Sequence, residues 1–329
     1  MKKIDILIPA YHAHDTIGRT LSSIAMQSMV NDLNVVICND EGHDNYDEFV
    51  ASFAPFMSIK EIYVPKNGGC GVARQYGIDH TDAPFFTCID ADDTFASTFA
   101  LEMLLNYIET DAKYVMVSGG FAEQLDNGLH FKNHLEDMIW MHGKLYRRSF
   151  IQKYDIRFNL TRSNEDNGFN RTIALISNDA EKVMFVPDIV YYWHFKKDSI
   201  TRVNNYEYTY NQSFPGYTQN MIDAVQNARK VRPEDTRQAD TWAIQAMAEL
   251  YVYLEQTLHH DPRFIKQNFD CCARYYKEIF EPMLPKVPRD ALERIFGGVL
   301  CAHAKENANF IYSATIPQFL DALKGVSLE

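Results

Sequence analysis

The chain has 329 residues, of which 46% are hydrophobic and 23% charged, and its formal net charge is -12. This composition indicates a folded globular protein long enough for two domains, and it excludes a largely disordered chain. The acidic balance disfavours non-specific binding to nucleic acid or to an anionic membrane surface, because both partners carry the same sign of charge.

Neither membrane insertion nor secretion is indicated. No apolar run approaches the ~20 residues that a spanning helix needs, and the N-terminal stretch lacks the apolar core of a signal peptide. The six cysteines form no disulfide framework and show no Cys-x-x-Cys metal spacing. We therefore expect a reduced, cytoplasmic protein without a membrane span.

The first third of the chain alternates short apolar runs with helical patterns, which is typical of a parallel sheet with crossover helices. Strands are expected at residues 4–9, 34–38, 59–64 and 84–89. Helices are expected at residues 15–29, 71–80 and 97–110, the last with Ser97 as its cap. The pattern is then mixed, with strands expected at residues 114–118, 182–186 and 190–193 and helices at 149–154 and 166–176. The fold class is therefore α/β.

Only helical periodicity remains in the last part of the chain. Helices are expected at residues 235–258, 262–280 and 288–309, each after a proline or an acidic start. We place a boundary in the aromatic and polar stretch 204–216. This gives a sheet-containing domain at residues 1–205 and a helical C-terminal domain at residues 206–329.

Polar residues and glycines gather where the expected strands end. The first strand ends at Pro9-Ala10-Tyr11 and the second at Asn39-Asp40, while the third leads into Asn67-Gly68-Gly69 and the fourth ends at Asp90–Asp93. In an open α/β sheet, ligands bind beyond the carboxyl ends of the strands. We therefore expect a ligand site built from these four segments.

Asp90, Asp92 and Asp93 place three carboxylates within four residues. Such a cluster is costly without a counter-charge, and a divalent ion that bridges a diphosphate would supply one. Carboxylate oxygens suit Mg²⁺ or Mn²⁺. The alternative is an Asp-rich turn in which Asp93 caps the next helix, and we favour the metal. His194, after an aromatic strand, is either a metal ligand or a satisfied interior histidine.

Asp40 and the loop at residues 67–71, which we call the glycine loop, are each open to two interpretations. Asp40 is a turn residue or an acceptor for a uracil imide or a ribose hydroxyl. The glycines after Asn67 allow close backbone approach, and the helix start that follows favours an anion. Arg74 can pair with an aspartate or a phosphate. The loop matches neither the dinucleotide fingerprint nor the P-loop.

Two later segments also carry candidates. Glu165 and Asp166 open a helix, where acids complement the helix dipole, or where one of them acts as a general base. The basic cluster Lys144–Arg148 would attract donor phosphates or cover the surface.

Taken together, these motifs resemble the family 2 glycosyltransferases, which have the GT-A fold. The resemblance covers residues 3–203 and rests on segments in the family's order, at residues 8–11, 16–27, 39–44, 67–75, 90–93, 143–148, 165–166 and 191–201. The chain departs from the family's pattern at Asn39 and Gln75, which stand where the family has Asp and Asn, and at Glu41, which is inserted before the glycine.

The resemblance implies an inverting enzyme and gives roles to single residues. According to this resemblance, Asp40 binds the nucleobase, Asp90 binds the ribose, and Asp92 binds the metal ion, which is Mn²⁺ or Mg²⁺. Asp166 is the implied catalytic base, with Glu165 as the next candidate. The remaining candidates are, for the donor, Pro9, Ala10, Tyr11, Asn67, Gly69, Arg74, Ala91 and Lys144, and, for the metal, His194.

We expect a single-transfer enzyme that moves a sugar from a nucleotide-diphosphate sugar, most simply a UDP-sugar, to a hydroxyl of a glycan, polymer or other acceptor. The Gln/Arg-x-x-Arg-Trp element of processive membrane synthases is absent. A nucleic-acid acceptor is disfavoured by charge. The C-terminal helices are expected to bind the acceptor or to form a homo-oligomer, since their apolar faces need a partner surface.

Two other functions match part of this pattern. The first is a sugar nucleotidyltransferase, but such enzymes usually carry a loop rich in glycine and arginine where this chain has Pro9-Ala10-Tyr11. The second is a nucleotide- or glycan-binding module without turnover, against which the presence of Asp92, Asp166 and Arg74 argues.

Overall fold

The computed structural model describes residues 2–40, 44–125, 128, 130–197, 199 and 205–326. Contacts divide the chain into a sheet unit, Met1–Arg162 with Ser177–Val203, and a helical unit, Ser163–Ile176 with Asn204–Glu329. The motif residues 41–43 and 200–201 lie outside the described residues. The functional boundary near residue 205 stays a prediction.

The sheet unit is built on one mixed sheet, which confirms the predicted α/β class. Among the described residues, nine strands pair in the order β3-β2-β1-β4-β8-β6-β9-β5, with β7 joined to β6. The strands are β1 Ile4–Ala10, β2 Leu33–Asn39, β3 Ser58–Tyr63, β4 Phe85–Cys88, β5 Thr94–Phe95, β6 Tyr114–Gln124, β7 Phe131–His134, β8 Lys144–Arg147 and β9 Lys182–Trp193. Strands β3, β2, β1 and β4 run parallel, so their carboxyl ends meet at one edge of the sheet.

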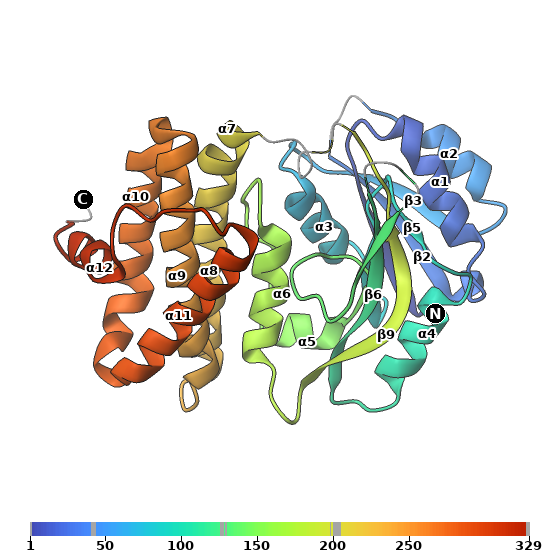
Figure 1. Cartoon of the computed structure of the whole chain (residues 1–329). Coiled ribbons are helices and arrows are strands. Elements are labelled where there is room, and N and C mark those ends of the chain that lie inside the picture. The colour runs from blue at the N-terminus through green and yellow to red at the C-terminus, as the bar shows by residue number, and fades with distance from the viewer. Residues whose placement is uncertain are drawn as a thin grey trace. The chain divides into compact units, whose positions relative to one another are not determined.

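Helices cover both faces of this sheet. They are α1 His14–Ala25, α2 Asp47–Phe53, α3 Cys70–Asp79, α4 Ala100–Glu109 and α5 Arg148–Lys153. Figure 1 shows α1 and α4 on one face and α3 on the other. The first face carries the main core, where Ile6 of β1 is buried in one cluster with Leu21 and Leu104. On the second face α3 lies close to the sheet, because a Cβ on Gly77 would come within 2.7 Å of Cys38 Sγ.

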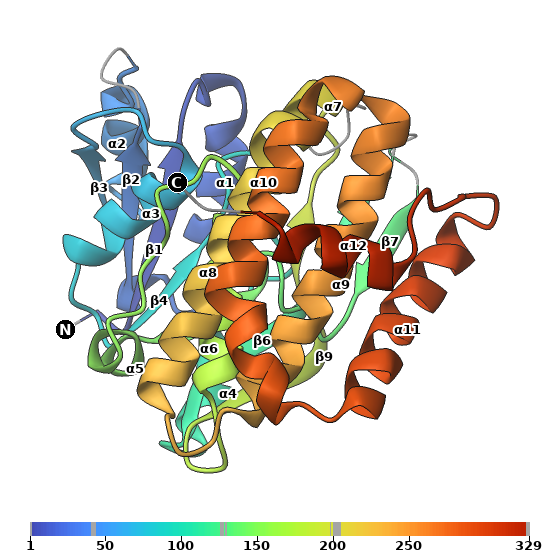
Figure 2. The same cartoon turned by 90° about the vertical axis from the view of Figure 1, so that its left-hand side faces the viewer.

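The helical unit contains α6 Glu165–Ile176, α7 Tyr206–Tyr208, α8 Phe214–Val231, α9 Arg237–His260, α10 Ile265–Tyr275, α11 Arg289–Glu306 and α12 Ile316–Lys324. Figure 2 shows α8, α9 and α10 side by side, and α6 packs on α8. The buried residues Ala243, Met247, Leu250 and Leu254 follow helical spacing on α9. Within the described part of the chain, no helix combines the length and the apolar character needed to cross a bilayer.

Several elements differ from the sequence-based expectation. Helix α1 ends at Ala25 rather than at residue 29, and the two expected strands within 182–193 form one strand, β9. The expected Ser97 cap is wrong, because α4 begins at Ala100 without a side-chain cap. Helix α8 was not expected, since buried polar residues such as Asn220 interrupt its apolar spacing. The proline in its first turn was the available signal.

Candidate functional site

Asp40, directly after β2, holds the glycine loop that follows β3. Its carboxylate oxygens accept hydrogen bonds from the backbone N–H groups of Gly68 at 3.0 Å and Gly69 at 2.7 Å. Gly69 has a φ of 89°, a conformation that favours glycine. Asp40 therefore fixes the turn ahead of α3, where a helix N-terminus can receive an anion. A carboxylate has about four lone-pair sites, so it can also accept from a ligand.

The ends of β1 and β3 complete this side of the sheet edge. The carbonyl of Ala10, next to the buried Pro9, accepts the backbone N–H of Asp40 at 2.9 Å, while Tyr11 is 52% exposed. Asn67 is held by Arg162, whose Nη1 donates to its Oδ1 at 2.8 Å. The structure thus brings the predicted segments together around the glycine loop.

Arg74 of α3 reaches the end of β4 and pairs with Asp90. Its Nη2 lies 2.7 Å from Asp90 Oδ1, and the Arg74 side chain is buried. Burial is the largest effect and works to raise the pKa of Asp90, but the charge of Arg74, the influence of His142 and the hydrogen bond from Arg74 together outweigh it, so the pKa lies below its ordinary value. Asp90 is therefore ionised at neutral pH. Its pair with Arg74 joins α3 to the turn at residues 90–93, which we call the aspartate turn. Ala91, next in the turn, is buried.

Asp93 ties the aspartate turn to the end of β9. Tyr191 Oη donates to Asp93 Oδ2 at 2.6 Å, and the backbone N–H of His194 donates to Asp93 Oδ1 at 2.8 Å. Asp93 therefore does not cap the next helix. Burial, and then the nearby charge of Asp90, raise the pKa of Asp93 well above its ordinary value.

The pairing of β5 with β9 brings the end of β9 next to Thr94, two residues after Asp92. His194 Nε2 shares a hydrogen bond with Thr94 Oγ1 at 2.8 Å, and Asp92 Oδ2 lies 3.5 Å from Lys196 Nζ. Burial, and then the charge of Arg19, lower the pKa of His194 to about 4. Burial and Asp90 raise the pKa of Asp92, while Lys196 lowers it. His194 is thus neutral at pH 7, and the carboxylate of Asp92, within the turn, is partly exposed.

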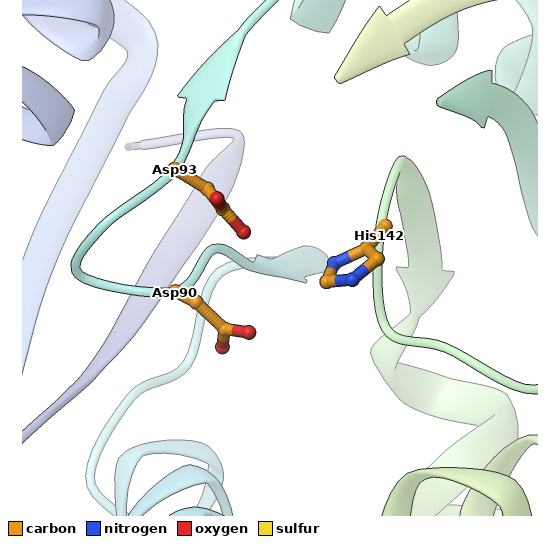
Figure 3. Close-up of side chains that lie close together, drawn as sticks. All are labelled: Asp90, Asp93 and His142. Atoms are coloured by element: carbon orange, nitrogen blue, oxygen red, sulfur yellow. The ribbon is translucent and has the colours of Figure 1, made fainter. Parts of the chain in front are cut away.

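His142 was not expected, and it lies against the same turn. One ligand atom each of Asp90, Asp93 and His142 lie within 4.8 Å of one another. Figure 3 shows both carboxylates and the imidazole facing a common space. Neither ring nitrogen of His142 has a hydrogen-bond partner among the described residues. Burial lowers the pKa of His142 to about 4, so the ring is neutral at pH 7.

An aromatic cage surrounds His142. Its ring centroid lies 4.6 Å from that of Tyr191, 5.0 Å from that of Phe121 and 5.3 Å from that of Trp193. These rings come from β6 and β9, which neighbour each other in the sheet. No sequence motif marks His142, and the available signal was Gly143, whose φ of 66° turns the chain into β8.

The remaining predicted residues are Lys144 and the acidic pair Glu165 and Asp166. Lys144 is fully buried, and its Nζ donates to Asp137 Oδ1 at 3.2 Å and to the His142 carbonyl at 3.4 Å. Glu165 and Asp166 open α6, which belongs to the helical unit. The roles of these three side chains stay predictions.

Known proteins resemble the chain over both its parts. Residues 5–164 match the sequence profile of Glycosyl transferase family 2. Glycosyltransferase GlyA of Streptococcus pneumoniae is 23% identical over 227 residues, which are 61% of this chain and 32% of that protein. The chain thus spans about a third of the length of this relative.

Two solved structures share the fold. TarS residues 1–349 of S. aureus, in complex with UDP-GlcNAc, superpose with a TM-score of 0.63 at 16% identity, over 95% of this chain and 94% of that one. Mannosyltransferase PcManGT from Pyrobaculum calidifontis was solved in complex with GDP-Man and Mn²⁺. It superposes with a TM-score of 0.51 at 14% identity, over 98% of this chain and 86% of that one. These likenesses confirm the predicted GT-A fold. The profile match shows a Glycosyl transferase family 2 domain in residues 5–164 of this chain.

Proposed function

We propose that this chain is an inverting glycosyltransferase that moves a sugar from a UDP-sugar to an acceptor hydroxyl with the help of a divalent cation. The observation that carries the proposal is the meeting of four strand ends at one sheet edge. There Asp40 accepts hydrogen bonds from the glycine loop, and Arg74 pairs with Asp90. The backbone N–H of His194 donates to Asp93, and Asp92 in the same turn lies 3.5 Å from Lys196. This arrangement supports the placement of the donor site at this edge of the sheet.

We take Asp92 and His194 as the residues that would hold the cation, because a carboxylate and an imidazole are both ligands of divalent transition metals. Asp92 has a longer contact with the protein than the other two aspartates, since its Oδ2 lies 3.5 Å from Lys196 Nζ. Asp90 is engaged by Arg74, and both oxygens of Asp93 accept protein hydrogen bonds. His194 is neutral at pH 7, which is the form that binds a metal.

One imidazole and one carboxylate suit Mn²⁺ better than Mg²⁺, which prefers oxygen ligands alone. The structure of PcManGT also contains Mn²⁺. When bound, the cation would neutralise charge on the diphosphate leaving group. The protein residues orient the donor: Asp40 on the uracil, Asp90 on the ribose, and the N-terminus of α3 near the phosphates. Pro9, Tyr11, Asn67 and Lys144 stay lesser donor-site candidates.

Asp166 is the proposed general base, with Glu165 as the second candidate. The acceptor hydroxyl attacks the anomeric carbon and loses its proton to the Asp166 carboxylate, while the bond from that carbon to the diphosphate oxygen breaks. A positioned base is worth roughly 10²–10⁴-fold in rate. A direct attack of this kind inverts the configuration at the anomeric carbon.

For the donor we propose UDP-GlcNAc, because TarS is a structural neighbour solved in complex with that molecule. For the acceptor we propose a hydroxyl of a glycan or polymer, since the net charge of -12 disfavours nucleic acid. The helices after residue 205 would bind that acceptor or another copy of the chain.

The test combines binding and turnover on the whole chain. We expect UDP to bind with Mn²⁺, more weakly with EDTA, and more tightly than GDP or ADP by calorimetry. With UDP-GlcNAc and Mn²⁺, slow release of UDP should be seen, with water as the acceptor. Equal affinity for the three nucleotides would contradict the role of Asp40, and the absence of UDP release would contradict the choice of donor.

A further inference from the structure

The turn that leads into α6 has an unusual backbone. Asn164 directly precedes Glu165 and has a φ of 61°, a left-handed conformation that costs energy in a residue other than glycine. Its carbonyl nevertheless accepts the first hydrogen bond of the helix, from the N–H of Gly168 at 2.9 Å. The Asn164 side-chain amide donates locally to Ser163 Oγ at 3.1 Å, and it has further partners from later in the chain.

Ser213, at the junction with α8, supplies these partners. The Asn164 side-chain amide donates to the carbonyl of Ser213 at 3.1 Å and to its hydroxyl at 3.0 Å. Both partners belong to the helical unit. The residue just before Glu165 is thus tied to a segment almost fifty positions later in the chain.

Asn220 of α8 supplies a second contact with this turn. Its side chain is fully buried, and its Nδ2 donates to the carbonyl of Gly216 at 2.8 Å and to that of Ser163 at 3.4 Å. One amide therefore links the backbone of α8 to the residue two positions before Glu165. Burying an amide is costly unless its hydrogen bonds are made, so these contacts hold Asn220 to one geometry.

The two helices approach too closely for this geometry to shift. A Cβ on Gly168 would lie 2.1 Å from Asn220 Oδ1, and a Cβ on Gly216 would lie 2.6 Å from the Ser163 carbonyl oxygen. Each helix therefore has a glycine at the contact. At the far end, Arg232 Nε donates to the carbonyl of Ile176, the last residue of α6, at 3.1 Å.

We propose that Asn220 is a positioning residue that sets the turn presenting Glu165 and Asp166. The inference rests on the proposed function, in which Asp166 takes the acceptor proton. A base works only within hydrogen-bond reach of that proton, and a misplacement of about 1 Å can cost on the order of 10²-fold in rate. The helical unit thus contributes to chemistry through α6, besides any contact with the acceptor.

The first test measures the turn without any substrate. Asn220→Asp keeps the shape of the side chain but removes the amide that donates to Ser163. Hydrogen exchange of peptides spanning residues 163–170 should quicken by about tenfold or more. The matched control is Asn268→Asp on α10, another fully buried asparagine, whose Nδ2 donates to Thr257 Oγ1 at 3.0 Å. The control should leave exchange at residues 163–170 unchanged.

The second test separates turnover from binding. UDP release from UDP-GlcNAc with Mn²⁺ should fall about tenfold or more in Asn220→Asp, while the dissociation constant of UDP stays within about twofold. In the Asp166→Asn background, Asn220→Asp should cause no further loss, because both changes act on the same step. Asn268→Asp should keep the turnover of the wild type.

A double variant guards against a failure of Asn220→Asp to fold. In Gly168→Ala with Asn220→Ala, the new methyl group enters space left by the lost amide, so packing is restored without the hydrogen bonds. We expect this variant to recover the melting temperature of wild type more than its turnover. Equal recovery of both would show that Asn220 only fills space.

The outcomes for the two proposals are distinct. Unchanged exchange at residues 163–170 in a folded Asn220→Asp variant, or a loss of turnover matched by Asn268→Asp, overturns the positioning role. Normal turnover in Asp166→Asn overturns instead the assignment of the base. If wild type releases no UDP from UDP-GlcNAc, the donor proposal fails, while the exchange experiment still decides on Asn220.

Discussion

The two groups of candidate residues in this chain are held in place in opposite ways. In the sheet unit, Asp40 and Asp90–Asp93 lie directly after β2 and β4, and the parallel order of the strands brings them together. In the helical unit, Glu165 and Asp166 open α6, and the preceding turn is held by hydrogen bonds to Ser213 and from the side chain of Asn220. One group is placed by sheet topology, and the other by contacts between remote segments.

This contrast bears on function, because donor binding and proton removal are separate tasks. The proposed donor-side residues are held within the sheet unit by contacts of Arg74 with Asp90, of Tyr191 with Asp93, and of the glycine loop with Asp40. The proposed base depends on α8. Changes in the sheet unit should therefore affect nucleotide or metal binding first, and changes around α6 should affect turnover first. The predictions below are ways to break or sharpen that division.

Asp92→Asn should have the largest effect on binding. It removes the carboxylate charge best placed for a cation and leaves a similar shape, so we expect Mn²⁺-dependent UDP affinity to fall by about 100-fold or more. Calorimetry with UDP, with Mn²⁺ and with EDTA, measures this loss. The matched control is Asp111→Asn, a partly exposed aspartate of the sheet unit that pairs with Lys113 at 2.7 Å rather than with a residue of the aspartate turn. UDP affinity and turnover at wild-type levels in Asp92→Asn would remove this residue from the metal site.

His142 should make the stability of the sheet unit depend on pH. Its pKa is lowered from 6.5 to about 4 by burial, so the folded state favours the neutral ring. The stabilisation is present above about pH 6.5 and is lost as the pH falls towards 4. Between pH 7 and pH 5, the wild-type free energy of unfolding should therefore fall by about 2 kcal/mol more than that of His142→Phe.

Urea unfolding at both pH values, with EDTA present, measures this difference. Phenylalanine suits the aromatic cage and does not titrate, so it isolates the protonation of the ring. Parallel pH dependence in wild type and His142→Phe would mean that His142 is not held neutral by burial.

Lys196→Ala should have the smallest effect. The ammonium lies 3.5 Å from Asp92 Oδ2 and the Lys196 side chain is 55% exposed, so the pair should contribute less than about 1 kcal/mol to stability. Because a cation and Lys196 would compete for the same carboxylate, Mn²⁺ should bind a few-fold more tightly to the variant. Weaker Mn²⁺ binding would indicate that Lys196 contacts the donor rather than competing with the cation.

The sheet edge was predictable from the sequence because each of its residues follows a strand signal in the chain. The apolar runs before Asp40 and Asp90 marked β2 and β4, and their carboxyl ends then follow from parallel pairing. His142 was missed because its neighbours, the rings of Tyr191 and Phe121, come from distant strands.

Helix α8 was missed for a related reason. Asn220 and Gly216 are polar or small on the face that α8 turns towards α6, so apolar spacing did not reveal the helix. Their value lies in close backbone approach and in hydrogen bonds to Ser163, which only the folded chain displays. A buried polar contact between segments far apart in the chain produces no apolar periodicity, so the sequence alone does not predict it.

The most direct test of the whole account is the Asp166→Asn variant, studied for UDP binding and for UDP-GlcNAc turnover on the same preparation with Mn²⁺. Asparagine keeps the size of the side chain but cannot accept the proton. The account predicts a UDP dissociation constant within about twofold of wild type and a turnover lower by roughly 10²–10⁴-fold. Normal turnover, or a loss of UDP affinity as large as the loss of turnover, would contradict the division between donor binding in the sheet unit and proton removal at α6.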